Sequence, residues 1–214
     1  MRASRGVGAM KARENPFGVQ RIEAIRYLPI GIEPGELPVR LEGLGGRGAI
    51  VGPAGSGKTR LLEELEGLLR DRGVSVKSVF VNDSRPLTGQ RCKELLGGSQ
   101  PGEVVLVDGA DSISRARWFR LKRGIIRGGA GLVVTSHRSG LLPTLVECEP
   151  TAGLFREIVG ELLEGGQVEG RLLDRVYERH RGNIREALCE LYDLWAGLAA
   201  PHAQGGDFAR VSGR

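Results

Sequence analysis

Short apolar runs alternate with amphipathic stretches along the first two thirds of the chain. Runs rich in valine, isoleucine and leucine predict five strands, at residues 48–52, 74–81, 103–108, 131–136 and 144–148. Leucine and isoleucine at helical spacing predict helices between them, at residues 58–72, 87–96 and 113–127. The run before Asp108 is continuously apolar, which is typical of a parallel strand buried on both faces. This alternation predicts an α/β fold, with a parallel sheet flanked by helices.

After Pro150 the strand pattern stops and only helical spacing continues. Three amphipathic stretches predict helices, at residues 154–163, 172–177 and 184–194, and Asn183 is the expected N-cap of the third. Residues 15–42 look irregular because four prolines interrupt them. We therefore predict a flexible basic arm at residues 1–14, an α/β core at 15–150, a small all-helical lid subdomain at 151–199 and a disordered tail at 200–214.

The turn after the first predicted strand has the composition of a phosphate-binding loop. It matches the pattern GxxxxGK[ST], and its members are Gly52, Pro53, Ala54, Gly55, Ser56, Gly57, Lys58 and Thr59. Its glycines let backbone N–H groups point at one centre, at the positive end of the following helix. Lys58 can reach the β- and γ-phosphates of a nucleotide, and the Thr59 hydroxyl can ligate Mg²⁺. The alternative is a Gly-rich turn that binds nothing.

Asp108 ends the third predicted strand, 50 positions after Lys58. A carboxylate at the carboxyl end of a neighbouring parallel strand faces the phosphate crevice and can hold Mg²⁺ directly or through water. This is the arrangement of a Walker B acid. The alternative is that Asp108 caps the helix that follows.

The order of P-loop, Walker B strand, polar-ended strand and helical lid resembles the AAA+ and related P-loop ATPases of the additional-strand class, over residues 15–198. The resemblance implies that Thr135, followed by Ser136, senses the γ-phosphate. It also implies that Arg185, in the lid, contacts the nucleotide. The segment around Phe17 is similar to segments that pack beside adenine in some of these ATPases.

Each of these positions has a simpler interpretation. Thr135 and Ser136 can bond local backbone at the strand end. Arg185 can be a solvated helix charge paired with Glu186 or Glu190. His137 can be a packed loop histidine, Arg138 either an ordinary loop residue or an arginine finger in a neighbouring subunit, and the Phe17 segment a turn with a hydrophobic anchor.

The chain departs from the family at the residue after Asp108. Most hydrolysing members place Glu there to polarise the attacking water, and this chain has Gly109. Asp111 either orients that water or caps the helix at 113–127, and Asp83 is a second candidate base. We therefore expect ATP binding with slow hydrolysis, and a catalytic set that the resemblance completes: Lys58, Asp108, Asp111, Thr135 and Arg185.

The formal net charge is +5, with 31 lysine and arginine residues. Six of them fall in the helix predicted at 113–127: Arg115, Arg117, Arg120, Lys122, Arg123 and Arg127. Trp118 and Phe119 lie among them, so Arg115 to Arg127 forms either a DNA-binding surface or a solvated face. Three widely spaced cysteines indicate free thiols in a reducing cytoplasm, and no apolar run approaches the roughly 20 residues of a membrane span.

Together these features predict an ATP-binding protein that acts as a nucleotide-dependent switch or slow ATPase on DNA or a protein partner. ATP is favoured over GTP because no guanine-reading motif occurs. The alternatives are a small-molecule or nucleotide kinase, and a nucleic-acid-binding module in which ATP is structural. Oligomerisation is left open.

Overall fold

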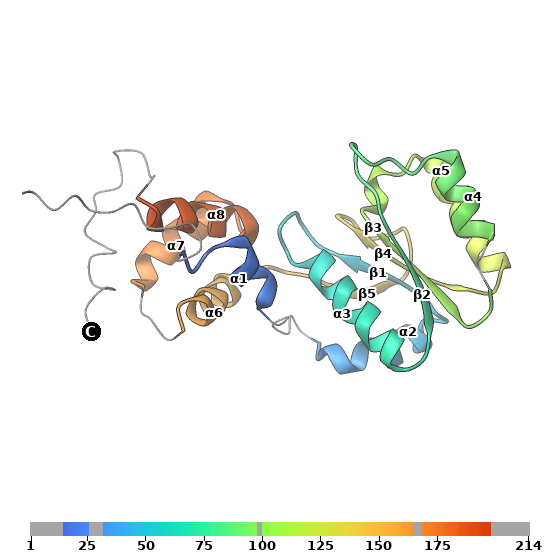
Figure 1. The fold of residues 1–214 in the computed structure, drawn as a ribbon, viewed down its shortest axis with the longest axis horizontal. Helices are drawn as coiled ribbons and strands as arrows, with labels where there is room; N and C mark the ends of the chain where they lie inside the picture. The colour runs from blue at the N-terminus through green and yellow to red at the C-terminus, as the bar shows by residue number, and fades with distance from the viewer. Residues whose placement is uncertain (1–14, 26–31, 98–99, 165–167, 198–214) are drawn as a thin grey trace, which may run out of the picture. The chain divides into compact units, whose positions relative to one another are not determined.

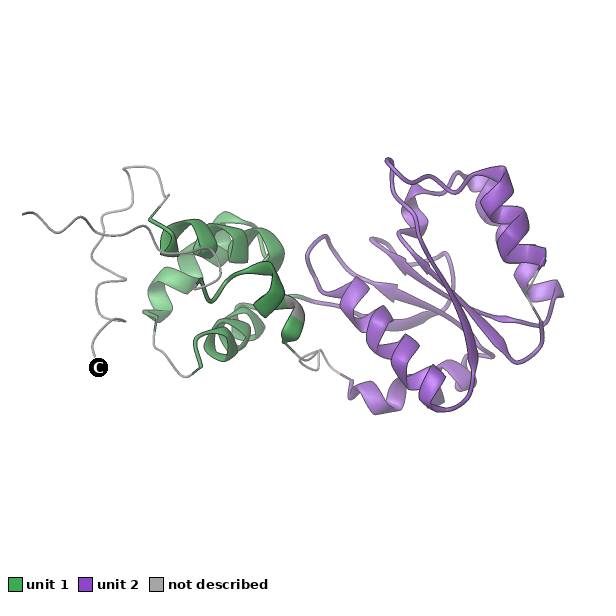
Figure 2. Ribbon diagram, in the orientation of Figure 1, with its two compact units in different colours: residues 1–28, 150–214 green, residues 29–149 purple. Residues whose placement is uncertain are grey.

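The computed structural model describes residues 15–25, 32–97, 100–164 and 168–197, and the chain divides into two compact units (Figure 2). One unit runs from Pro29 to Glu149 and holds the sheet. The other combines Met1–Leu28 with Pro150–Arg214. The predicted basic arm at 1–14 and tail at 200–214 lie outside the described residues.

The sheet has five parallel strands in the order β2-β3-β4-β1-β5 (Figure 1). They are β1 (Arg47–Val51), β2 (Ser75–Phe80), β3 (Glu103–Asp108), β4 (Gly131–Ser136) and β5 (Thr144–Glu147). β4 lies between β1 and β3, with Val51 opposite Ser136 and Val107 opposite Val134. The P-loop strand and the strand of Asp108 are thus separated by one strand. The predicted α/β fold with a parallel sheet is confirmed.

Helices cover both faces of this sheet (Figure 1). α2 (Leu37–Gly43) and α3 (Lys58–Asp71) lie on one face, and α4 (Gly89–Gly97) and α5 (Arg115–Arg127) lie on the other. Two single 3₁₀ turns, η2 (Pro34–Glu36) and η3 (Ala110–Ser112), precede α2 and α5. The apolar run of β3 is buried throughout, as expected for a strand covered on both sides.

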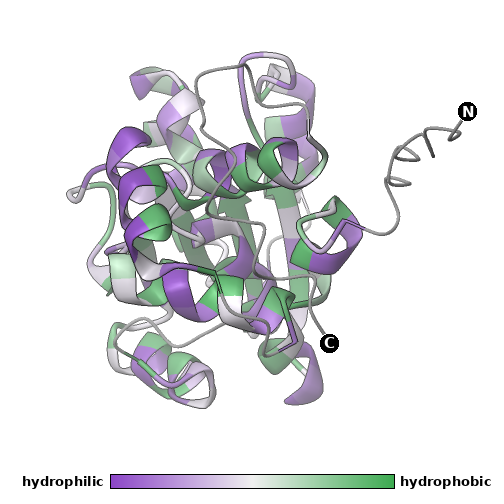
Figure 3. Ribbon diagram, turned by 90° about the vertical axis from the view of Figure 1, so that its left-hand side faces the viewer, coloured by the Kyte–Doolittle hydropathy of each residue, from purple (hydrophilic) through white to green (hydrophobic). Residues whose placement is uncertain are grey.

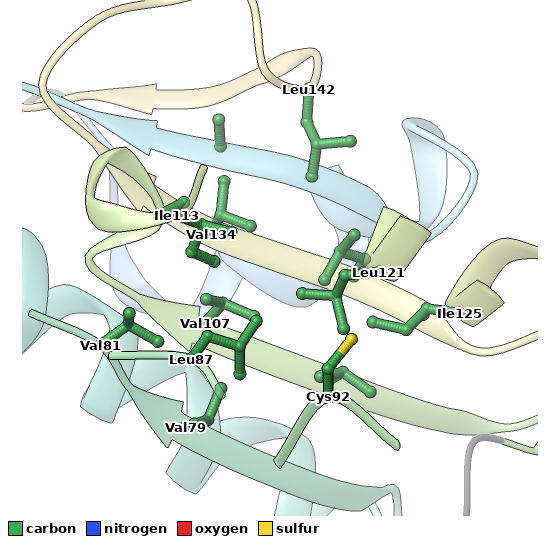
Figure 4. Packing of buried hydrophobic residues seen from close by; sticks show 14 of the residues in the cluster. Val79, Val81, Leu87, Cys92, Val107, Ile113, Leu121, Ile125, Val134 and Leu142 are labelled. Carbon is green, nitrogen blue, oxygen red and sulfur yellow. The ribbon is translucent and has the colours of Figure 1, made fainter. Parts of the chain in front are cut away.

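Small aliphatic side chains fill the layer between the sheet and the α4–α5 pair (Figure 4). Val107 and Val134 meet Leu121 and Ile125 of α5 there. Gly124 lets α4 approach α5, because a Cβ at that position would lie 2.2 Å from Leu96 Cδ2. The low aromatic content of the chain, 5%, is therefore compatible with a close-packed core.

Within the described ranges, the regular elements of the second unit are all helices. It contains α1 (Val19–Ala24), α6 (Ala152–Leu162), α7 (Gly170–Arg179) and α8 (Ile184–Trp195). Thr151 caps α6 by accepting from the Leu154 N–H. Asn183 caps α8 by accepting from the Glu186 N–H, and this cap was predicted. The helices carry hydrophobic and hydrophilic residues on the same turns, which is the pattern of amphipathic helices around a core (Figure 3). None of the helices in the described ranges has the length and apolar character that a membrane crossing needs.

Residues 15–25 group with these C-terminal helices, which differs from the predicted core boundary at residue 15. Phe17 is 1% exposed in the core of the helical unit and packs edge-on against Trp195. The Asn15 side chain donates to the Tyr192 carbonyl and accepts from the Phe17 N–H. The Phe17 segment is thus a hydrophobic anchor between helices.

The stretch predicted to be irregular also contains two short helices, α1 and α2. Prolines did not prevent α2 because Pro38 occupies its first turn, where a backbone N–H has no intrahelical acceptor.

Replacing Phe17 with alanine tests whether the segment around Phe17 shares one core with the C-terminal helices. Phe17→Ala should lower the free energy of unfolding by about 3–5 kcal/mol, as for other buried phenylalanines. Val19 is 70% exposed two residues later, so Val19→Ala should change stability by less than about 0.5 kcal/mol. Denaturant unfolding measures both, and equal stability of the two variants would contradict the packing.

Candidate nucleotide-binding site

The P-loop connects the carboxyl end of β1 to the first residue of α3, the position that its sequence predicts. The Gly52 N–H donates to the Ser136 carbonyl at 3.1 Å, which ties the start of the loop to the end of β4. Gly55 and Gly57 have φ angles of 72° and 84°, which L-residues with a Cβ rarely adopt. α3 then begins at Lys58 and places its N-terminal N–H groups at the loop.

The inner side of the loop is tightly constrained. A Cβ on Gly52 would lie 2.5 Å from the Cys148 carbonyl oxygen and 2.6 Å from Ser56 Oγ, so only glycine fits there. Ser56 is 1% exposed, and its hydroxyl is buried with no hydrogen-bond partner among the described residues. A buried polar group without a partner is uncommon, and it is consistent with a loop built to accept a polar ligand.

Lys58 lies over the same loop. Its Nζ donates to the carbonyls of Gly52 at 2.8 Å and Pro53 at 2.6 Å. Burial lowers the pKa of Lys58, and the negative charges of Asp111 and Asp108 act in the opposite direction. A partly desolvated ammonium beside loop N–H groups is a suitable partner for phosphate.

Cys148 lies beside Lys58 and is fully buried. Burial raises the pKa of the Cys148 thiol to about 11, against the opposing effect of the Lys58 charge. The thiol is therefore neutral at pH 7, so the carboxylates supply the negative charge near Lys58 at that pH. Cys92 is also buried and Cys189 is exposed, and all three thiols are free.

Asp108 joins three parts of the site. Its Oδ2 accepts from the Thr59 hydroxyl at 2.9 Å, and its Oδ1 accepts from the Thr135 hydroxyl at 2.5 Å. The Thr135 hydroxyl in turn accepts from the Gly109 N–H at 2.8 Å. Asp108 therefore does not cap the following helix. It connects the first turn of α3 with the ends of β3 and β4.

Thr59 and Asp108 fit a magnesium site shared with a nucleotide. One hydroxyl and one carboxylate on neighbouring elements are the protein ligands that Mg²⁺ takes when phosphates and water supply the rest. The described residues contain no group of three or more acidic, histidine or cysteine side chains that could hold a metal alone. A metal bound by phosphate as well as protein agrees with this sparse donor set.

Asp111 serves neither as a helix cap nor as a free carboxylate. The residue at the N-cap of α5 is Ser114, so the predicted capping role of Asp111 is wrong. Its carboxylate instead faces the end of β4. Oδ1 lies 3.0 Å from the Ser136 hydroxyl, and Oδ2 accepts from the His137 N–H at 2.7 Å.

Gly109 is required by the backbone at the position where the family pattern has Glu. Its φ is 87°, and a Cβ there would lie 2.1 Å from the Val81 carbonyl oxygen. No side chain can occupy this position without moving the segments that follow β2 and β3. The departure from the family pattern is therefore built into the contact between these two segments.

No described side-chain contact joins the remaining predicted residues to this cluster, although the Arg138 backbone is hydrogen-bonded to the Ser136 hydroxyl. Asp83 and Arg138 are exposed in the sheet unit, and Arg185 is exposed in the first turn of α8. Arg185 forms no ion pair with Glu186 or Glu190 among the described residues; those two glutamates lie against His180. The roles of Arg138 and Arg185 stay predictions.

The similarity of this chain to known proteins is detectable in structure and not in sequence. No protein-family model matches the sequence, and no curated protein is detectably similar to it. Two matching structures are of the replication initiator DnaA. One, from Aquifex aeolicus with AMPPCP, has 18% identity, a TM-score of 0.55 and coverage of 83% of this chain and 65% of that one. The other, with AMPPCP and single-stranded DNA, has 17% identity, a TM-score of 0.55 and coverage of 79% and 62%.

A third match is a variant of RuvB from Thermotoga maritima, with 21% identity, a TM-score of 0.51 and coverage of 73% of this chain and 58% of that one. DnaA and RuvB are AAA+ P-loop ATPases. This chain has the AAA+ P-loop NTPase fold. It spans less than two thirds of the length of each of these three structures. The AAA+ fold accounts for the strand order, in which β4 separates β1 from β3.

Sequence reasoning missed the partners of Asp111 and the constraint at Gly109. Both depend on which residues face each other across the sheet edge, and this is not visible in any single segment. Gly109 after the apolar strand, with Asp111 two residues later, was the only local signal available.

Replacing Gly109 with alanine tests whether the Val81 carbonyl excludes a side chain at this position. Gly109→Ala should lower the free energy of unfolding by at least about 2 kcal/mol, since it combines an unfavourable φ with a backbone clash. Gly102 has a φ of 84° and no atom near its Cβ position, so Gly102→Ala should cost only about 1 kcal/mol. Thermal or denaturant unfolding compares them, and equal costs would show that Val81 does not restrict residue 109.

Proposed function

We propose that this protein binds ATP and Mg²⁺ at the P-loop and uses the nucleotide to control a DNA-bound state. The proposal is carried by one observation, the hydrogen bonds that join Thr59, Asp108 and Thr135 across three elements. The same fold occurs in DnaA structures with AMPPCP, an ATP analogue, which supports the choice of adenine nucleotide.

In this proposal each residue of the loop has a defined task. Backbone N–H groups from residues 52–57 and the start of α3 hold the phosphates, and Lys58 moves from the loop carbonyls to the β- and γ-phosphates. Thr59 and Asp108 would hold Mg²⁺, which neutralises phosphate charge. Because Gly109 supplies no carboxylate, we expect turnover below the roughly 1 s⁻¹ at the lower end of typical enzymes.

Removal of the Lys58 ammonium tests nucleotide binding. Lys58→Ala should raise the dissociation constant for ATP at least about tenfold, equivalent to about 1.4 kcal/mol. Lys93 is an exposed lysine on α4, so Lys93→Ala should leave the affinity unchanged. Calorimetric titration measures both, and full ATP affinity in a folded Lys58→Ala protein would refute the site.

A second assay, which measures phosphate release and transfer to candidate acceptors, distinguishes an ATPase from a kinase. Phosphorylation of a small acceptor would identify a kinase and contradict the proposal. Phosphate release in water alone, or stimulated by DNA, agrees with an ATPase.

DNA is the proposed partner because of the exposed face of α5. Five arginines are exposed there and form no ion pair among the described residues: Arg115, Arg117, Arg120, Arg123 and Arg127. Phe119 is 66% exposed between them, whereas Trp118 packs against the core. Unpaired arginines around an exposed aromatic ring suit phosphate contact with base stacking. One DnaA structure with this fold contains single-stranded DNA.

Two links run between this face and the proposed nucleotide site, one along the chain and one through a hydrogen bond. η3 begins two residues after Asp108 and leads directly into α5. Lys122 of α5 also donates to the Leu141 carbonyl, which lies in the turn that follows β4. Movement of Asp108 or of the β4 end on nucleotide exchange would therefore reach α5.

Charge removal on α5 tests the DNA surface. Replacing Arg115, Arg120 and Arg123 with glutamine should weaken DNA binding and reduce the salt slope by about 2–3, if each arginine neutralises one phosphate. A matched control replaces Arg60, Arg70 and Arg156, which are ion-paired on other helices, with the same change in net charge. Salt-dependent fluorescence anisotropy measures the slopes. Equal slopes in the two triple variants, or no DNA binding at low salt, would contradict the proposal.

A further inference from the structure

The two hydroxyls at the end of β4 are buried and already hydrogen-bonded within the protein. Thr135 and Ser136 are each 1% exposed. The Thr135 hydroxyl donates to Asp108, and the Ser136 hydroxyl lies 2.7 Å from the Arg138 carbonyl and 3.0 Å from Asp111. The first exposed polar side chain beyond this strand is His137, whose side chain is 56% exposed. His137 is thus the first side chain beyond β4 that is exposed to solvent.

Asp111 contacts His137 at its backbone and lies near its ring. The backbone N–H of His137 donates to Asp111 Oδ2 at 2.7 Å, and the ring Nδ1 lies 3.3 Å from the same oxygen. A carboxylate at Nδ1 favours the tautomer with the proton on Nδ1, which leaves Nε2 as the acceptor. An imidazole oriented in this way by an acid is the arrangement of a general base.

This pair lies beside the phosphate loop. The Gly52 N–H donates to the Ser136 carbonyl, one residue before His137. Asp111 is close enough to Lys58 for its charge to act on the ammonium. The backbone at Gly109 excludes the glutamate that the family pattern has there. Asp83, the other predicted base, is exposed and has no described partner that would orient its carboxylate.

We propose that His137, oriented by Asp111, is the general base for ATP hydrolysis in this protein. The inference rests on the proposed function, because it requires ATP at the P-loop. His137 Nε2 accepts a proton from water while the water oxygen bonds to the γ-phosphorus. The bond from that phosphorus to the bridging oxygen breaks, and ADP leaves with the electron pair. The products are ADP and inorganic phosphate, and the proton on His137 passes to solvent.

In this scheme Asp111 is a positioning residue. It does not contact the nucleotide, and its effect on hydrolysis passes through the imidazole. The effects of the two residues should therefore not add, because a displaced or absent imidazole leaves Asp111 nothing to orient.

The decisive experiment is chemical rescue. His137→Ala should lower single-turnover ATP hydrolysis about 100-fold or more, the usual minimum for a general base, and leave ATP affinity unchanged. Added imidazole should restore part of the rate. Ser139→Ala, an exposed change two residues along, is the control and should hydrolyse ATP as the unmodified protein does.

Asp111→Asn provides the second variant. It should slow hydrolysis, and the double variant with His137→Ala should be no slower than His137→Ala alone. Full activity of His137→Ala, a slow His137→Ala that imidazole does not accelerate, or additive losses in the double variant would overturn the assignment. An unmodified protein that binds ATP but never hydrolyses it would also overturn it and leave nucleotide binding intact. Absence of ATP binding would instead refute the proposed function itself.

Discussion

The pair of hydrogen bonds to Asp108 is the interaction on which the site depends. One oxygen of this carboxylate accepts from Thr59 on α3 and the other from Thr135 on β4. These bonds require that β4 lie between β1 and β3, since only that order brings three chain-distant polar groups to one edge of the sheet. The chemistry of the site therefore depends directly on the strand order.

The geometry at the same edge of the sheet explains why this chain has no carboxylate directly after Asp108. Gly109 keeps β3 against the Val81 carbonyl, so the residue after Asp108 has no side chain to offer. The next acid, Asp111, comes one turn later and faces the end of β4 instead of the helix that follows it. In the proposed function Lys58 contacts the phosphates, and any catalytic base has to come from another position. His137 is the exposed group that the edge places there.

The sequence was sufficient for features encoded within one segment. The P-loop, the buried strand ending in Asp108 and the Asn183 cap each carry their signal in consecutive residues, and the structure has them at the predicted positions. It was insufficient where distant segments meet. Phe17 gave no sign that its partner is Trp195 in α8. Gly109 gave no sign that the Val81 carbonyl, just after β2, excludes a Cβ there. Tertiary contacts decide such positions, and no local pattern records them.

The central claim is that Thr59 and Asp108 share a metal with a bound nucleotide. It is tested most directly by titrating the unmodified protein with ATP, with Mg²⁺ present and with Mg²⁺ removed by a chelator, and comparing the two dissociation constants calorimetrically. The account predicts ATP binding in both conditions, with an affinity at least about tenfold higher in Mg²⁺, or about 1.4 kcal/mol. Equal affinities with and without Mg²⁺, or no binding in either condition, would contradict it.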